Sequence, residues 1–154
     1  MADSTSLPVR HRDPGLRLIG YAERVLVRCP ACGQRALSTR HRDGYRYADP
    51  ARLTCARCGY ARETRKLAHV YGVPLDPFFK QPLWLQTACC GHTLWALNVE
   101  HLDALEGYVS AQLREKRLDL AYTMLDVLPG WMKAAKHRDE VLRAVSRLRQ
   151  SLET

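Results

Sequence analysis

The chain has no long apolar run, which excludes the simplest membrane architecture. None of its apolar stretches approaches the roughly 20 residues that a membrane-spanning helix requires. Its start, MADSTSLPVRHRDPG, is polar and lacks the apolar core of a secretory signal. We therefore expect a cytoplasmic protein with no membrane partner. We also expect residues 1–15 to form a flexible arm, because they have little to bury.

The chain also lacks the motifs of the common enzyme classes. It contains no phosphate-binding P-loop, no GxSxG nucleophile elbow and no HExxH metalloprotease motif. No pair of carboxylates is placed convincingly for acid–base chemistry. We therefore predict a protein that is not an enzyme and that takes no small-molecule substrate.

Acidic residues are scarce in the first half of the chain. Residues 1–70 hold 14 Lys and Arg against 6 Asp and Glu, whereas residues 71–154 hold 10 of each. The net charge of +8 therefore lies entirely in the first half. A basic surface of this kind attracts polyanions, of which nucleic acid is the first candidate, although it is also compatible with a solvated, arginine-rich face.

Two of the three cysteine pairs have metal-site spacing. CPACG holds Cys29 and Cys32, and CARCG holds Cys55 and Cys58, with 22 residues between the pairs. Two thiolates three positions apart on a tight turn converge on one side of a tetrahedral ion, and a second such turn closes the site. Such pairs in a reducing compartment indicate a metal rather than disulfides. We predict one structural Zn²⁺ held by all four thiolates.

Short strand-forming segments surround these two pairs. The turn signal Asp43-Gly44 predicts a tight hairpin, and each strand is bounded by a knuckle or a turn residue. Residues 16–71 are therefore predicted to form a zinc ribbon, a small antiparallel sheet stapled by zinc. Its strands are expected at residues 25–28, 36–42, 45–47, 52–54 and 60–67.

Arginines and tyrosines are interleaved along this predicted sheet. Guanidinium groups bind phosphates in a bidentate manner, and tyrosines can stack on unpaired bases. Asp43 is the only carboxylate at the expected hairpin tip, which argues against the carboxylate pair of some transcript-cleavage ribbons. The predicted nucleic-acid-binding residues are Arg35, Arg40, Arg42, Tyr45, Arg46, Arg52, Arg57, Arg62, Arg65 and Lys66.

Residues 72–98 are predicted to be a connector followed by a hairpin. GVPLDPFFKQP holds three prolines and has no helical period, so it is read as the connector. The apolar runs LWLQTAC and TLWALN then flank Cys90-Gly91-His92, which predicts a tryptophan-rich hairpin that can extend the sheet of the ribbon. Aligned with CPACGQRA, the segment TACCGHTL has the form of a third knuckle without its first cysteine.

Cys89, Cys90 and His92 leave three interpretations open. A turn with one buried thiol is favoured, because no cysteine follows Cys90 to complete a ligand set. A second metal held with the help of His101 or His69 is possible. So is a nucleophilic thiol with His92 as its base.

The last third of the chain, residues 99–154, is predicted to be helical. Asn98 is a suitable N-cap, and apolar residues then recur at helical spacing. The first helix is expected to present Leu102, Leu105, Val109 and Leu113 on one face and to end in Arg114, Lys116 and Arg117. Two further helices are expected over residues 119–128 and 131–152, with Pro129 near the start of the last.

In motif order, the chain resembles small bacterial zinc-ribbon proteins of the transcription-factor IIB type, a group of unassigned function. The matching segments are CPACG, LTCARCGY, PLWLQTACCGHTLWALN, EHLDALEGYVSAQLRE and LPGWMKAAKHRDEVL, over roughly residues 25–150. The resemblance implies that ribbon, hairpin and helices form one architecture.

We predict an α+β protein that binds nucleic acid or a nucleoprotein complex without catalysis, mainly through backbone contacts. An adaptor that docks a protein partner through the ribbon or the helices is the alternative. A Cys/His enzyme at the CCGH turn is the least favoured interpretation.

Overall fold

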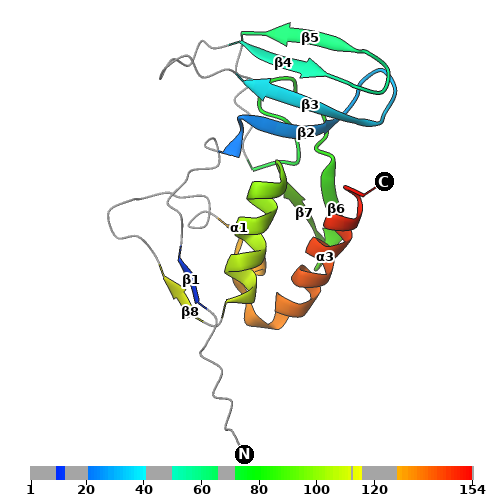
Figure 1. Cartoon of the computed structure of the whole chain (residues 1–154). Helices are drawn as coiled ribbons and strands as arrows, with labels where there is room; N and C mark the ends of the chain where they lie inside the picture. Colours follow the sequence, from blue (N-terminus) through cyan, green and yellow to red (C-terminus); the bar gives the residue numbers. More distant parts are fainter. Residues whose placement is uncertain are drawn as a thin grey trace, which may run out of the picture.

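The structure, a computed structural model, describes residues 10–12, 21–40, 50–65, 72–111, 113–115 and 128–153. These residues form the predicted α+β fold. A four-stranded antiparallel sheet lies at one end of the molecule, and a two-stranded hairpin and three helices lie beside it (Figure 1). None of the described helices is long and apolar enough to cross a membrane.

The four-stranded sheet follows from strict alternation of apolar and polar residues. In RVLVR, Val25 and Val27 are completely buried while Arg24 and Arg28 are exposed, as a strand with one covered face requires. The predicted strand over residues 45–47 and the turn Asp43-Gly44 lie outside the described residues. The sheet consists, in spatial order, of β2 (Arg24–Arg28), β3 (Arg35–Arg40), β4 (Ala51–Thr54) and β5 (Ala61–Thr64).

The connector joins this sheet to the rest of the molecule. Leu83 is completely buried and forms an antiparallel bridge with Val27. On the same edge of β2, Arg28 N–H donates to the Pro82 carbonyl (2.9 Å), and Trp84 N–H donates to the Leu26 carbonyl (3.0 Å). The outer edge of β2 is therefore paired rather than open, which leaves fewer unsatisfied backbone groups there.

The predicted hairpin is formed by β6 (Leu85–Cys89) and β7 (His92–Ala96). It is a sheet of its own and does not add its strands to the four-stranded sheet. Backbone contact between the two parts runs through the Val27–Leu83 bridge and the neighbouring bonds, which include Leu26 N–H donating to the Leu97 carbonyl at 2.9 Å.

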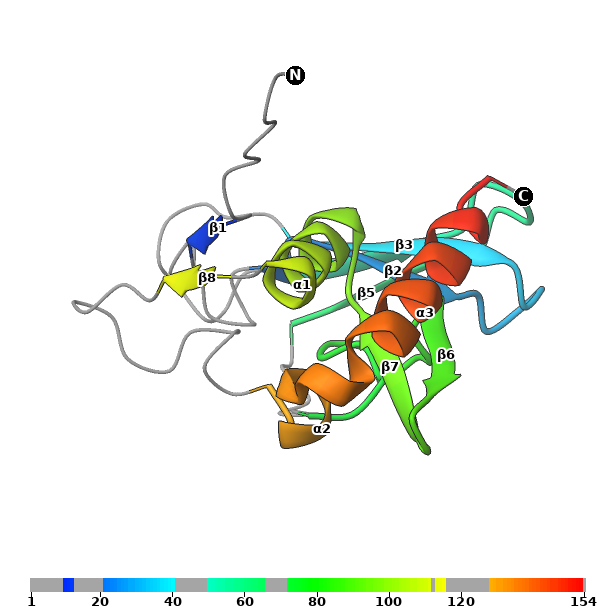
Figure 2. The same ribbon diagram turned by 90° about the horizontal axis from the view of Figure 1, so that it is seen from below.

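Helices α1 (Val99–Ser110) and α3 (Arg138–Gln150) lie side by side, with the hairpin next to α3 (Figure 2). Their contact is apolar in its centre, where Leu102, Leu105, Val141 and Val145 are buried. At its rim, Arg149 bridges the two helices by binding Asp103 (2.5 Å) and Glu106 (3.0 Å) of α1.

Two helical predictions are wrong in their extent. Helix α1 ends at Ser110, and Leu113 and Arg114, which were expected to belong to it, lie in β8 (Leu113–Glu115) instead. Lys116 and Arg117, the other residues expected to close the helix, lie outside the described residues. Strand β8 pairs in parallel with β1 (Arg10–Arg12), which lies inside the segment expected to be a flexible arm. A partner strand distant in sequence thus overrides the local helical pattern. Residues 119–127 of the expected second helix lie outside the described residues.

The expected single helix over residues 131–152 is also broken. Helix α2 (Gly130–Lys133) is followed by Ala134, whose φ of −69° and ψ of 126° are extended, and a short 3-10 helix (Ala135–His137) precedes α3. The carbonyl of Trp131, which would bond forward in a continuous helix, lies 2.7 Å from the Nδ1 atom of His137. A side chain therefore replaces the helical bond at the break.

His101 gives the fold a pH dependence. Its side chain is buried, and its Nδ1 accepts a hydrogen bond from the Leu97 N–H (3.0 Å). Burial lowers the pKa of His101 to about 4. The unfolded chain takes up this proton near pH 6.5, so below that pH protonation favours unfolding.

We therefore expect His101 alone to remove about 3 kcal/mol from the free energy of unfolding between pH 6.5 and pH 4. Urea unfolding across this range, with the His101 ring followed by NMR, measures the effect. The variant His101→Asn keeps an acceptor near the same place and does not titrate, so its stability should change less over the range. If the native protein and the His101→Asn variant lost equal stability over this range, titratable groups other than His101 would be responsible.

Candidate metal centre and basic sheet face

The two CxxC segments form equivalent turns at one end of the four-stranded sheet. In each turn, the glycine after the second cysteine donates its N–H to the carbonyl of the first cysteine, at 2.9 Å in both cases. Gly33 and Gly59 have φ values of +72° and +79°, a left-handed conformation that favours glycine over residues with a side chain. The sequence CPACG and its repeat CARCG therefore specify the same local geometry.

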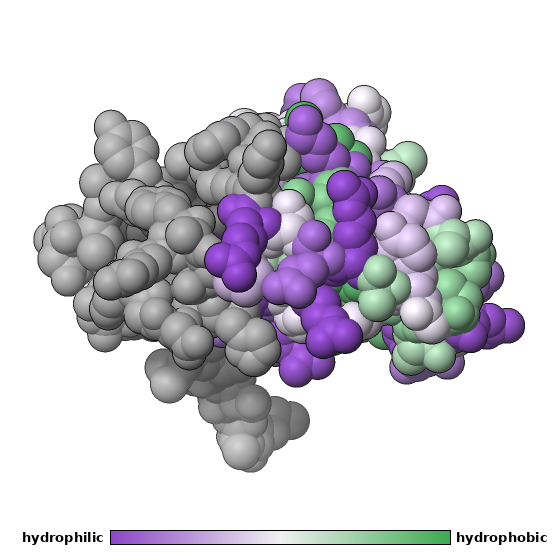
Figure 3. All heavy atoms as spheres, turned by 90° about the horizontal axis from the view of Figure 1, so that it is seen from above, coloured by the Kyte–Doolittle hydropathy of each residue, from purple (hydrophilic) through white to green (hydrophobic). Residues whose placement is uncertain are grey.

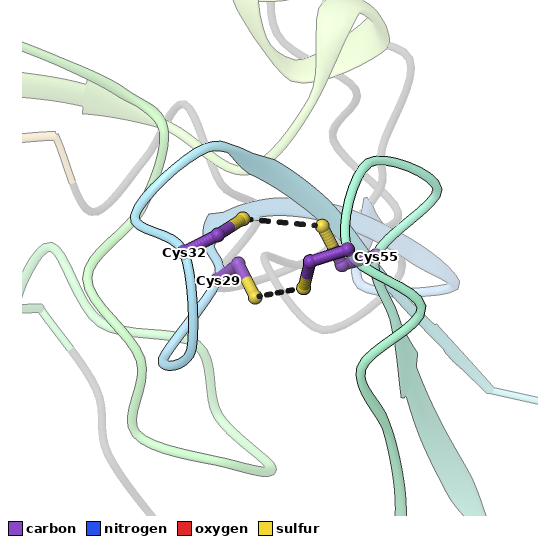
Figure 4. Close-up of side chains that lie close together, drawn as sticks. Cys29, Cys32 and Cys55 are labelled. Carbon is purple, nitrogen blue, oxygen red and sulfur yellow. Dashed lines mark hydrogen bonds between the residues drawn. The ribbon is translucent and has the colours of Figure 1, made fainter.

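These turns bring the four predicted ligands together. The sulfur atoms of Cys29, Cys32, Cys55 and Cys58 all lie within 4.8 Å of one another. Figure 4 shows the side chains of the two turns pointing into one small volume, with Sγ–Sγ distances of 3.6 Å for Cys29–Cys58 and for Cys32–Cys55. All four cysteines are free thiols.

The sulfur spacing fits a tetrahedral ion. Four sulfurs placed about 2.3 Å from a central ion would lie about 3.8 Å from one another, close to the observed 3.6 Å. The donor set consists of four thiolates, which suits zinc or iron rather than a hard cation such as Mg²⁺. The cluster is therefore able to hold a metal ion.

The thiols of the cluster do not ionise independently. Burial opposes ionisation of Cys29, but hydrogen bonds from nearby backbone N–H groups, including that of Ala31 at 3.4 Å, lower its pKa to about 7. The backbone of Tyr60 favours the Cys58 thiolate, but desolvation and the neighbouring thiols raise its pKa to about 12. Four thiolates at this spacing repel one another, and a central cation would compensate their charge.

The register of the sheet places four arginines on one face. Residues paired across antiparallel strands point to the same side. Arg28 pairs with Arg35, and Arg24 is in line with Thr39 and Arg52. All four arginines are exposed. We define the basic sheet face as Arg24, Arg28, Arg35 and Arg52; the exposed Glu63, which pairs with Arg52, lies on the same side at the edge of the face.

Arg24 and Arg28 were not among the predicted binding residues. The signal that identifies them is the alternation in RVLVR, because two arginines flanking two buried valines must share the opposite face. Arg35 has an additional contact, since its Nη1 donates to the Leu152 carbonyl beyond the end of α3 at 3.0 Å.

Two of the other predicted binding residues lie on the opposite side of the sheet. Arg40 pairs with the buried Ala51 and lies over the Phe78 ring (5.8 Å), and Arg62 pairs with the buried Leu53, so both belong to the opposite side of the sheet. Exposed hydrophilic residues cover much of the described surface on the β5 side (Figure 3). Arg57 and Arg65 are exposed outside the strands, and Arg42, Tyr45, Arg46 and Lys66 lie outside the described residues.

The CCGH segment forms the turn of the β6–β7 hairpin. Cys90 and Gly91 have φ values of +52° and +75°, and Cys89 pairs with His92 where the two strands end. Cys89 is buried and Cys90 is half-buried, so the structure contains the expected turn with a buried thiol. His92 stacks on Trp131, with ring centroids 4.9 Å apart and planes at 5°.

The carboxylate of Glu140 lies close to these two thiols. The ligand atoms of Cys89, Cys90 and Glu140 all lie within 4.8 Å of one another. Neither His92 nor His101 belongs to this group within the described part of the chain, and His69 lies outside it. Glu140 is 50 residues from Cys90, and no spacing or period in the sequence indicates that it approaches.

No protein-family model matches this chain, and no curated protein or solved structure matches it either.

Proposed function

We propose that the cysteine cluster is the structural Zn²⁺ site of a zinc ribbon, of the kind that the sequence resembles. The supporting observation is that two equivalent turns supply four thiolates at tetrahedral spacing. Four protein ligands leave no coordination position for a substrate or a water nucleophile. The role of the ion is therefore to hold β2, β3, β4 and β5 together rather than to catalyse a reaction.

We further propose that the protein binds nucleic acid, or a nucleoprotein complex, through the basic sheet face. The observation that carries this proposal is the Arg28–Arg35 pair. Two cations directly opposite each other repel, and they are retained here on an exposed surface. A phosphate group between or beside them would relieve this repulsion and accept bidentate hydrogen bonds.

The array also has a suitable size for a nucleic-acid backbone. Neighbouring strands lie about 4.8 Å apart, so Arg24 and Arg52, two strands apart, are separated by about 10 Å. Contacts on this scale reach a few successive phosphates of one strand. They read charge and shape rather than base sequence, so little sequence preference is expected.

Binding should be steeply dependent on salt. We expect the affinity for mixed-sequence DNA or RNA oligonucleotides to fall with salt concentration, with a slope of log K against log salt of about −0.7 to −0.9 for each phosphate contact. The double variant Arg28→Ala/Arg52→Ala should reduce the magnitude of this slope by about 2 and weaken binding to all sequences. Fluorescence anisotropy at several salt concentrations provides the measurement.

Arg62→Ala is the matched control, because Arg62 is exposed on the opposite side of the same sheet. It should leave both the affinity and the slope nearly unchanged. Absence of binding at low salt, or an affinity insensitive to salt, would contradict the proposal. If the control and the double variant lost equal affinity, the basic sheet face would not be the binding site.

A protein partner is the second candidate for the same face. Leu26 and Leu37 pair across β2 and β3 in its centre and are half-buried, so the arginines surround an apolar spot. Such a combination of apolar centre and charged rim also occurs at protein interfaces. Affinity capture with and without nuclease separates the two candidates, since only nucleic-acid-mediated complexes disappear with nuclease.

A further inference from the structure

We propose that Cys89, Cys90 and Glu140 form a second metal site, for one thiophilic divalent cation such as Zn²⁺. The two sulfurs lie 3.5 Å apart, near the distance that two thiolates on one tetrahedral ion would have. The carboxylate of Glu140 completes a group whose ligand atoms all lie within 4.8 Å of one another. Two thiolates and one carboxylate are ligand types that zinc accepts.

Adjacent cysteines on a regular strand could not form this group. Successive side chains of a strand point to opposite faces, so Cys90 would point away from Cys89. The left-handed φ of +52° at Cys90 turns its side chain back to the same side. The backbone of the turn therefore creates the convergence that the sequence alone argues against.

The conformation of Cys90 is itself unfavourable for this residue type. Two-residue hairpin turns with positive φ at both positions favour Asn, Asp or Gly at the first position. Within the described residues, only Lys80 and Cys90 have a positive φ without being glycine. Strained backbone of this kind is retained where a side chain has a role, and here the strained residue presents a thiol to a second thiol and a carboxylate.

Glu140 is held against the turn by α3. Its Oε1 accepts a hydrogen bond from the Cys90 N–H (3.0 Å), and seven residues further on Arg147 donates to the Ala88 carbonyl (3.0 Å). Helix α3 is thus attached to the end of β6 at two points. The bond to the Cys90 N–H orients the Glu140 carboxylate, and the carboxylate lies close to both sulfurs, where it could serve as a ligand.

The donor set of the group suits a cation. Two sulfur atoms and a carboxylate oxygen lie within 4.8 Å of one another, and a cation between them would compensate the charge of two thiolates and a carboxylate. His92 is not part of this group, and its ring stacks on Trp131. A bound dication would supply the charge that lets both thiols ionise, as thiolate ligation requires.

Three protein ligands leave one position of a tetrahedral ion open. Glu140 is exposed and Cys90 is half-buried, so this position faces the solvent side of the turn. The second site is therefore expected to exchange its ion more readily than the four-thiolate cluster. This difference allows the two sites to be measured separately in one sample.

Metal stoichiometry on the full-length chain tests the proposal. After reconstitution with excess Zn²⁺ and removal of the unbound ion, we expect two zinc ions per chain in the native protein. A mild chelator should remove one ion first and expose two thiols to a thiol reagent. The variants Cys90→Asn and Glu140→Gln should each bind one zinc ion.

Cys90→Asn keeps the fold testable, because Asn suits the turn conformation while removing the ligand. His92→Gln is the matched control and should retain two zinc ions, since His92 is adjacent to the turn but outside the ligand group. One zinc ion per native chain with two freely reacting thiols would overturn the proposal. A second ion retained by both ligand variants, or a Cys89–Cys90 disulfide in the native protein, would do the same.

Discussion

Removing the proposed ion from Cys29, Cys32, Cys55 and Cys58 is expected to unfold two strands of the four-stranded sheet, β4 and β5. Structural zinc contributes about 10–16 kcal/mol in small zinc-finger peptides at neutral pH, whereas the whole stability of a typical domain is about 5–15 kcal/mol. These two strands have few apolar contacts to replace it, since β5 buries none of its side chains and β4 buries only Ala51 and Leu53. A strong chelator, or Cys55→Ser, should therefore abolish the amide protection of β4 and β5.

Hydrogen exchange followed by NMR, together with metal analysis, measures this effect strand by strand. Cys90→Asn serves as the control, because it removes a thiol far from the cluster and should leave the sheet and its ion in place. The hairpin and helices α1 and α3 bury more apolar side chains than β4 and β5 do, so they should lose less protection than these two strands. Full protection of β4 in metal-free protein would show that the ion does not hold the sheet.

Asn98→Ala is expected to lower the free energy of unfolding by about 3 kcal/mol, because one side chain serves two structural elements. Its Oδ1 accepts from the His101 N–H (2.9 Å) and caps α1, which contributes about 1 kcal/mol. Its Nδ2 donates to the carbonyls of Tyr21 (2.5 Å) and Arg24 (2.7 Å) at the start of β2. Losing a donor at a buried carbonyl costs about 1–3 kcal/mol.

Asn98→Asp separates these two contributions. The carboxylate keeps the helix cap but cannot donate to the two carbonyls, so this variant should remain clearly less stable than the native protein. Urea unfolding at pH 7 compares the three proteins. Native-like stability of Asn98→Asp would show that the bonds to the Tyr21 and Arg24 carbonyls contribute little.

The cluster Cys29, Cys32, Cys55 and Cys58 could be predicted from the sequence because its geometry is local. Each turn spans five residues, and its glycine sets the backbone that makes two thiols converge. The cap of α1 was equally predictable, since the Oδ1 of Asn98 reaches an N–H only three residues ahead. The CxxCG turns and the helix cap each depend on the dihedral angles of a few adjacent residues, so they can be predicted without knowledge of the fold.

The helical boundaries were less predictable, for a physical reason. Leu113 continues the apolar period of α1, yet it lies in β8 because β1, about a hundred residues earlier, supplies a pairing strand. The break at Ala134 likewise depends on the His137 ring reaching the Trp131 carbonyl. In both cases a backbone group bonds to a group outside the predicted helix, and the periodicity of apolar residues gives no information about such a bond.

The clustered cysteines, the α+β class and the alternating strands could be predicted because each depends on the spacing of neighbouring residues. Which arginines share a face, and which group meets the CCGH turn, depends on how the chain packs. Arg52 and Arg62 diverge because of strand register, and Glu140 reaches Cys90 because α3 packs on β6. These placements depend on contacts between distant segments, which form only when the apolar core closes.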